Sequence, residues 1–471
     1  MPDHLTQLTN HIISQIHTLG FNSPRGSVIR ALLDIAYFAS LRTEEGRFIR
    51  GSLTYADPTS PDFNPPLRRR ADYPSFTAFP RQERLTVEMF VKLSRAIDNW
   101  SGAIAVYGTK TTNLFVWGVV DQRVHENIRI HREGIQGFSN PGILTVTMEG
   151  VGAISVTHGD LFLCALRQNQ IVTRENDVLT TQVLGDRILP LFSTVASQIA
   201  LLLGDNQKLS DILASLFSEW SNAIARICIG LRRNGTGGSL LITPSPIMPL
   251  LDIVHPFPYR RLYESMILKV LDKRYLRKMQ EKLREVLSEK TVPSKLVIEV
   301  ALSEADEADR TDELTGAVKI VTSIASADGV VLLNPTLSVD AFGVKIRAGR
   351  NAVTVYDGAE FMQRGTGAKK IDVSNLGTRH GSMLRYCRAD KKAVGIVVSQ
   401  DGHVRMIASK GGSLVLWPNV MLLHYYHNVR EYAREERRNR FFRNKHQEQK
   451  SFGYTQMPKS VAKLLAYRMK K

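Results

Sequence analysis

The sequence has few cysteines, no long apolar run and no N-terminal pattern typical of a leader, and each observation narrows the classes of protein that we expect. Its three cysteines, Cys164, Cys228 and Cys387, lie far apart, with no CxxC pair and no metal-ligand spacing. We therefore predict buried thiols, and neither a disulfide framework nor a zinc site. No stretch approaches the roughly 20 apolar residues that cross a bilayer, and the N-terminus lacks a basic start followed by an apolar run. We expect a globular, cytoplasmic protein with no transmembrane segment.

Positive charge is abundant but unevenly distributed. The net charge is +17, and residues 430–471 contain thirteen Lys and Arg against four Asp and Glu, so +9 of the total lies in this segment. Residues 421–471 are therefore predicted to be a basic helical tail. A solvated helical extension is the favoured interpretation, and an arm that binds nucleic acid or an anionic surface is the alternative.

The front of the chain, residues 1–185, is predicted to be an α+β domain. It starts with amphipathic helical patterns, continues through a Pro-rich connection to a helix near residues 84–100, and then changes period. Five short β-rich runs between residues 102 and 175 predict an antiparallel sheet. No catalytic constellation is visible here, because the candidate side chains are scattered: Asp121, His125, His131 and His158. We interpret this domain as a sensor or regulatory domain.

Residues 186–420 are predicted to be a second domain of α/β class, with a mixed sheet flanked by helices. A strong apolar stripe over residues 209–228 predicts a helix that leads through a Gly-rich turn into a buried strand over residues 239–243. Residues 244–313 differ from their flanks and are interpreted as an insertion or lid, with a Pro-rich loop, a charged helix (275–290), a strand (295–302) and an acidic loop (303–313). Helix–strand alternation resumes from Leu314.

Three short motifs in this second domain could hold phosphate groups, although each alone is also typical of an ordinary turn or cap. The first is the turn Gly235, Thr236, Gly237 and Gly238, whose successive N–H groups can form an anion nest. The second is Asp328-Gly329 between a helix and a strand, where a carboxylate can bind a divalent cation. The third is Gly377-Thr378-Arg379-His380, where Thr378 suits an N-cap and a helix N-terminus favours anions.

In this order and these surroundings the motifs resemble the diadenylate cyclase (DAC) family. In that family a helix leads through a Gly-rich turn to a strand, a second helix ends in a DGA motif, and a GTRHR motif opens a helix that is followed by a strand ending in VVS. The corresponding segments here are GTGGSLLIT, ADGVVLL with downstream FGVKI, GTRHGSMLRYC and VGIVVSQDG. The resemblance covers roughly residues 205–415 without the insertion.

The resemblance implies roles for individual residues. Asp328 corresponds to the family's metal-binding aspartate, for Mg²⁺ or Mn²⁺, with Gly329 beside it, and Arg379 and His380 complete the implied catalytic set. The implied nucleotide-binding residues are Gly235, Thr236, Gly237, Gly238, Gly329, Gly377, Thr378 and Ser399. Two positions depart from the family pattern: Val330 stands where the motif has alanine, and Gly381 where it has arginine. The second Asp-Gly pair, Asp357-Gly358, spells DGA with Ala359, but its context predicts an exposed turn.

The resemblance also implies an activity and an assembly. Two ATP molecules would be condensed to cyclic di-AMP and pyrophosphate between two such domains, so a face-to-face homo-oligomer is expected. Asp328 and the Thr-Arg-His triplet favour this enzyme. Val330, Gly381 and the long insertion favour the alternative, a nucleotide sensor that binds ATP or a cyclic dinucleotide without turnover.

Overall fold

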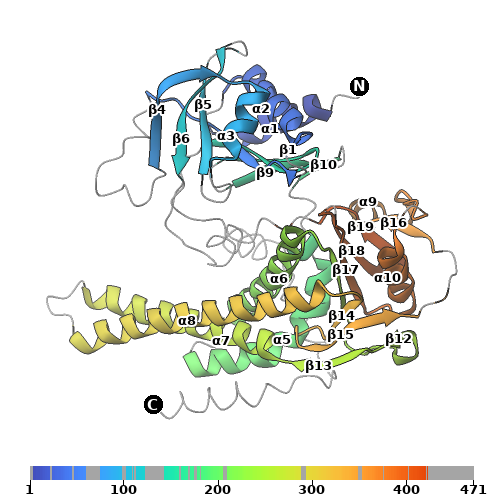
Figure 1. Ribbon diagram of the computed structural model, residues 1–471. Coiled ribbons are helices and arrows are strands. Elements are labelled where there is room, and N and C mark those ends of the chain that lie inside the picture. The colour runs from blue at the N-terminus through green and yellow to red at the C-terminus, as the bar shows by residue number, and fades with distance from the viewer. Residues whose placement is uncertain are drawn as a thin grey trace. The chain divides into compact units, whose positions relative to one another are not determined.

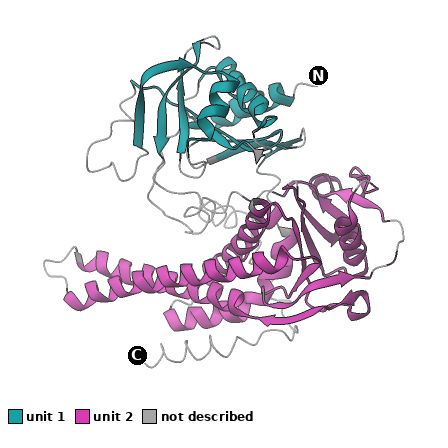
Figure 2. Ribbon diagram, viewed as in Figure 1, with its two compact units in different colours: residues 1–176 teal, residues 177–471 magenta. Residues whose placement is uncertain are grey.

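A computed structural model describes most of the chain. The described residues are 4–21, 24–44, 47–59, 75–97, 102–108, 110, 113–121, 143–158, 161–167, 170–173, 178–180, 182–204, 209–287, 293–347, 349, 353–374, 376–400, 402–420 and 422. The chain forms two compact units, residues 1–176 and 177–471 (Figure 2). The predicted basic tail, apart from residue 422, lies outside the described residues, as do His125 and His131.

In the described part of unit 1, residues 1–176, three helices lie against one face of an eight-stranded sheet. The helices are α1 (His4–Thr18), α2 (Gly26–Ser40) and α3 (Val87–Ser94). The strand order is β10-β9-β8-β7-β3-β5-β6-β4, and β1 (Thr43–Glu44) and β2 (Arg47–Phe48) form a separate pair. The sheet strands are β3 (Gly51–Tyr55), β4 (Ser75–Arg84), β5 (Gly102–Tyr107), β6 (Phe115–Asp121), β7 (Leu144–Gly150), β8 (Ala153–His158), β9 (Leu161–Arg167) and β10 (Gln170–Val172).

The five β-rich runs of the sequence are five of these strands, β5 to β9, and their mutual pairings are antiparallel. Alternating apolar residues explain this, because one side of the sheet buries its side chains under the helices. The sequence does not reveal β4, whose burial pattern is largely exposed, nor the parallel pairing of β3 with β5. His158 is buried and stacks on Phe21, with ring centroids 4.2 Å apart.

Unit 2, residues 177–471, is a three-layer α/β structure, which confirms the predicted mixed sheet flanked by helices (Figure 1). The sheet order is β12-β15-β14-β11-β17-β18-β19-β16, and β13 pairs with β15. Its strands are β11 (Gly238–Ile242), β12 (Leu251–Asp252), β13 (His255–Tyr259), β14 (Val330–Leu333), β15 (Val339–Ile346), β16 (Val355–Asp357), β17 (Val394–Val398), β18 (Val404–Lys410) and β19 (Ser413–Trp417). The helices are α5 (Gln182–Leu203), α6 (Leu209–Asn234), α7 (Arg261–Leu287), α8 (Ser294–Ala325), α9 (Gly358–Arg364) and α10 (Thr378–Ala389).

Two apolar cores lie on opposite faces of this sheet. One face packs against the long helices α5 to α8 and buries Trp220 and Phe192 completely. The other face packs against α10 through Met383, Leu384 and Cys387. By length and composition, α5 is long and apolar enough to cross a membrane, yet its buried residues belong to the first core, which is typical of a core helix. The sequence led us to expect no transmembrane segment, whereas α5 meets the criteria of length and composition for one.

The predicted strand over 295–302 and acidic loop over 303–313 are wrong. Both belong to α8, a single helix of 32 residues that lies against α7 (Figure 1). The burial pattern is helical, because Val300, Ser303, Thr311 and Leu314 are buried at helical spacing, whereas Val297, Ile298 and Leu302 of the predicted strand are exposed. Tyr275 on α7 donates a hydrogen bond to Glu299 Oε1 at 2.5 Å, so the neighbouring helix supplies the partner that local sequence does not show.

The predicted Pro-rich loop before α7 is also partly wrong, because it contains the edge strands β12 and β13. Pro256 and Pro258 lie in β13, which pairs antiparallel with β15. Proline is tolerated in an edge strand, where its missing N–H can face away from the ladder. These two strands bring the segment between Pro244 and α7 onto the sheet.

Candidate functional site

The three sequence motifs meet at one end of the central strands of the unit 2 sheet. β11 and β14 are parallel neighbours, with Leu240 level with Val331, so both strands begin at the same edge. β17 runs antiparallel to β11 and ends there, with Val398 opposite Gly238. We call this place the corner; it comprises residues 235–238, 328–329 and 398–400 and the N-terminus of α10.

The Gly-rich turn of the corner needs its glycines for backbone reasons. Gly235 and Gly237 have φ of 64° and 63°, which is the left-handed region that other residues avoid. A Cβ atom at Gly237 would lie 2.7 Å from the Val398 carbonyl oxygen and 3.1 Å from Arg379 Nη1. The turn therefore lets α6 pass directly into β11 while its main chain stays close to both β17 and α10.

The Asp-Gly motif has a similar requirement. Gly329 has a φ of 101°, and a Cβ atom there would lie 2.6 Å from the backbone carbon of Gly343 on β15. Asp328 Oδ1 accepts a hydrogen bond from the Gly329 N–H at 3.0 Å, and the Asp328 side chain is 98% exposed. The carboxylate is thus held beside its own backbone and faces solvent at the corner.

Arg379 joins the motifs. Its Nη1 atom lies 3.5 Å from the Thr236 carbonyl oxygen, and its Nη2 atom lies 3.8 Å from Asp328 Oδ1. Both contacts are long and solvent-accessible, so we assign them about 1 kcal/mol at most. The guanidinium is therefore available to an incoming anion, for which it offers a planar pair of donors.

The other residues of the third motif lie differently from expectation. The N-cap of α10 is Gly377, without a side-chain capping hydrogen bond, and Thr378 is the exposed first residue of the helix, so the prediction of Thr378 as N-cap is wrong. His380 is buried, and its Nε2 atom lies 3.0 Å from Arg405 Nη1 on β18. Since arginine only donates, Nε2 accepts when this bond forms, and the ring proton is then on Nδ1. No sequence motif indicates that Arg405 contacts His380, because Arg405 reaches this histidine only through the position of β18 in the sheet.

Ser399 closes a tight turn between β17 and β18. Its N–H donates to the His403 carbonyl oxygen at 2.9 Å, and its hydroxyl oxygen accepts from the His403 N–H at 3.1 Å. In this arrangement the hydroxyl group is engaged by the turn. Its contribution to the corner is to hold the end of β17 in place.

The second Asp-Gly pair is not an exposed turn, contrary to the sequence prediction. Asp357 ends β16 and is the N-cap of α9, where it accepts hydrogen bonds from the N–H groups of Ala359 and Glu360 at 3.0 and 3.1 Å. Gly358 lies against the ring of Trp417. β16 is an edge strand, and β18 and β19 lie between it and β17, so this aspartate is well separated from the corner.

One carboxylate of the corner, that of Asp328, could contact a divalent cation. Among the residues that the structure describes, no group of three or more His, Cys, Asp or Glu could hold a metal ion. Asp328 is one exposed carboxylate, and Mg²⁺ is commonly held by one or two carboxylates together with substrate phosphates and waters. Asp328 therefore fits such an ion as a single protein ligand.

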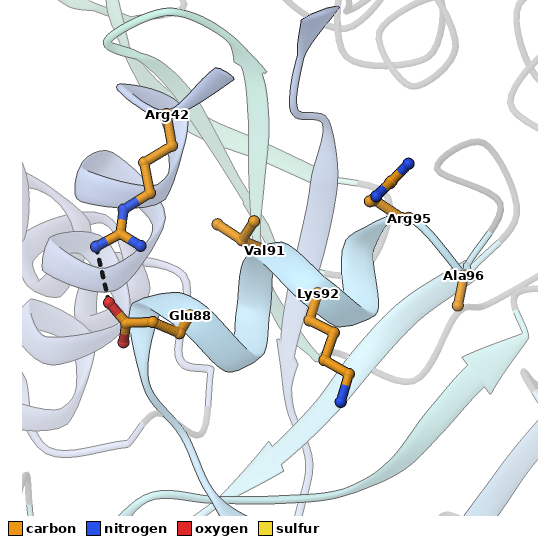
Figure 3. Close-up of a pocket in the computed structure, with 6 residues that line it drawn as sticks. All are labelled: Arg42, Glu88, Val91, Lys92, Arg95 and Ala96. Atoms are coloured by element: carbon orange, nitrogen blue, oxygen red, sulfur yellow. Dashed lines mark hydrogen bonds and ion pairs between the residues drawn. The ribbon is translucent and has the colours of Figure 1, made fainter. Parts of the chain in front are cut away.

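Two pockets can be described among the residues of unit 1 that the structure describes. One, of about 480 Å³, is lined by Arg42, Glu88, Val91, Lys92, Arg95 and Ala96, with Arg42 Nη2 2.7 Å from Glu88 Oε1 (Figure 3). The second, of about 230 Å³, is lined mainly by polar and aromatic groups: Pro58, Gln82, Tyr107, Gly108, Asn113, Phe115 and Trp117. Neither is part of the corner, since both lie wholly within residues 1–176.

Comparison with known families identifies part of unit 1. Residues 21–121 match the family described as the probable sensor domain DACNV, which is the N-terminal domain of diadenylate cyclases. The match covers about a fifth of the chain and includes every residue that lines the two pockets. No curated protein matches the chain. Unit 1 is therefore similar to a sensor domain, and the DAC-like assignment of unit 2 depends on its own residues.

Proposed function

We propose that unit 2 binds ATP at the corner and joins two ATP molecules into cyclic di-AMP, under the control of unit 1 as a sensor. The observation that carries this proposal is the meeting of Asp328, Arg379 and the Gly-rich turn at one sheet edge, although they are separated by some 140 residues of sequence. The similarity of residues 21–121 to a sensor domain of diadenylate cyclases supports it independently.

The corner offers the groups that such a reaction needs. The turn at 235–238 and the N-terminus of α10 present backbone N–H groups, and Arg379 adds a delocalised positive charge for phosphate oxygens. Bound Mg²⁺ or Mn²⁺ would supply charge neutralisation and lower the pKa of the attacking hydroxyl group. The 3′-oxygen of one ATP would form a bond to the α-phosphorus of the other as the bond from that phosphorus to the bridging oxygen breaks, which releases pyrophosphate and a proton. The same step in the opposite direction would close the ring and release a second pyrophosphate and a second proton.

This chemistry requires two corners, because each ATP supplies a nucleophile to the other. We therefore propose a face-to-face homo-oligomer as the active form. Catalysis would consist of positioning and charge stabilisation, with no covalent intermediate on the protein. A cytoplasmic location is consistent with ATP as substrate.

The alternative is a nucleotide sensor that binds without turnover. Gly381 favours it, because a positive charge expected one turn into α10 is missing. Val330 favours the sensor less strongly than the sequence alone indicates, because its side chain is 7% exposed and packs in the core on the α10 face of the sheet. A buried side chain at this position leaves the solvent side of the corner unobstructed.

Incubation of the purified full chain with radiolabelled ATP and Mn²⁺ tests the proposal. We expect cyclic di-AMP and pyrophosphate from the wild type and no product from Asp328→Ala. Because the Asp328 side chain is 98% exposed, this variant should fold normally. Asp357→Asn is the matched control: it changes the other Asp-Gly pair, keeps an N-capping side chain and should keep activity. Binding without product would establish the sensor, and absence of binding would refute both functions.

A further inference from the structure

Four aromatic rings line the ribbon formed by β13 and β15. His255 is directly opposite Phe342 in the strand register, and their rings stack with centroids 4.8 Å apart. Phe257 meets the edge of Phe342 at 5.7 Å and stacks on Tyr259 at 5.5 Å. Phe257, Tyr259 and Phe342 are partly buried against the core, whereas His255 is exposed. The three inner rings thus fix the position of an outer ring that faces solvent.

This outer ring borders the corner. Gly343, which follows Phe342, has a φ of 66° and lies against the backbone of Gly329. A Cβ atom at Gly343 would lie 3.2 Å from His255 Cδ2 and 3.7 Å from the Asp328 carbonyl oxygen. The backbone of Gly329 and Gly343 therefore lies between Asp328 and the imidazole, and the Val254 Cβ atom lies at the same distance as the Asp328 carbonyl oxygen, 3.7 Å from that position.

We propose that the exposed face of His255, backed by Phe342, is a stacking platform for the purine base of the nucleotide whose phosphates occupy the corner. The inference rests on the proposed nucleotide binding and adds the position of the base. Aromatic rings bind bases by stacking, and a ring already held in a ladder loses little freedom when it does so. His255, Phe257 and Tyr259 come from the segment between Pro244 and α7, which lies outside the DAC resemblance, so the exposed ring of the platform is a feature of this chain's own insertion.

Comparison of ATP with inorganic triphosphate separates base recognition from phosphate recognition. Calorimetric titrations of the full chain with Mg²⁺ and each ligand should show tighter binding of ATP by the wild type. His255→Ala should weaken ATP binding roughly tenfold, equivalent to about 1.4 kcal/mol, and leave triphosphate binding unchanged. His255→Phe keeps an aromatic ring and should retain ATP affinity. Tyr356→Ala, which removes an aromatic partner of Phe361 on the far edge strand β16, is the matched control and should change neither affinity.

The outcomes distinguish this inference from the function on which it rests. If the wild type binds both ligands but His255→Ala binds ATP as tightly as the wild type, the platform is refuted and the phosphate corner survives. Equal affinity of the wild type for ATP and triphosphate would also refute the platform alone. Failure of the wild type to bind either ligand would overturn the corner and the platform together.

Discussion

Replacement of Gly329 by alanine should destabilise unit 2, because the position excludes a Cβ atom for two reasons. Its φ of 101° is a conformation that side chains rarely adopt, and a Cβ atom would approach the Gly343 backbone carbon to 2.6 Å. The backbone conformation alone costs about 1–3 kcal/mol. The steric clash adds to this cost, because it is with the main chain of a neighbouring strand, which cannot rotate away as a side chain can. We expect a total of about 3 kcal/mol, toward the upper end of single-residue effects.

Differential scanning calorimetry of the ligand-free full chain measures this effect. A loss of 3 kcal/mol should lower the melting temperature of unit 2 by roughly 5–10 °C. Gly381→Ala is the matched control, since Gly381 lies inside α10 and a Cβ atom there would meet only the end of the Arg385 side chain, at 3.3 Å. It should stabilise the unit by about 0.5–1 kcal/mol, because glycine is a poor helix former. A Gly329→Ala protein that melts with the wild type would refute the packing argument.

Three further predictions follow from other parts of unit 2. Gly381→Arg adds a positive charge one turn into α10, so it should raise affinity for triphosphate in titration calorimetry; unchanged affinity would place the phosphates elsewhere. Lys269 is fully buried with its Nζ atom 3.4 Å from Glu219 Oε2, and Lys273 Nζ lies 3.8 Å from Glu219 Oε1. Lys269→Met removes the shorter of these two contacts and should destabilise the unit by about 3 kcal/mol in urea unfolding, with part of the loss recovered by adding Glu219→Gln. Burial raises the pKa of Cys228 and Cys387 to about 12 from 9.0. The unfolded thiols lose protons first as pH rises above 9, so stability should fall between pH 9 and 12, and a thiol reagent at pH 8 should react only after unfolding.

Local patterns in the sequence were sufficient for the elements that depend on nearest neighbours. The apolar stripe of α6, the β-rich runs of β5 to β9 and the helix that ends before Asp328 were predicted because each carries its own period. The same reasoning failed for α8, where a segment of eight residues with six apolar ones fits either period, and for β13, where two prolines obscure an edge strand. In both cases the partner that decides the structure is elsewhere in the chain.

For the corner, the sequence determined which residues are chemically suitable, and tertiary structure decided which of them meet. A carboxylate, a guanidinium group and a glycine-rich turn can be recognised in the sequence, because their chemistry is a property of the residue type. Their approach within 3.8 Å depends on β14 and β17 flanking β11, a pairing between segments far apart in the chain. The pairing of β18 with β17 places Arg405 beside His380, and the pairing of β13 with β15 sets His255 beside Gly343. Long-range strand order is fixed by the burial of both faces of the sheet at once, and no local window contains that information.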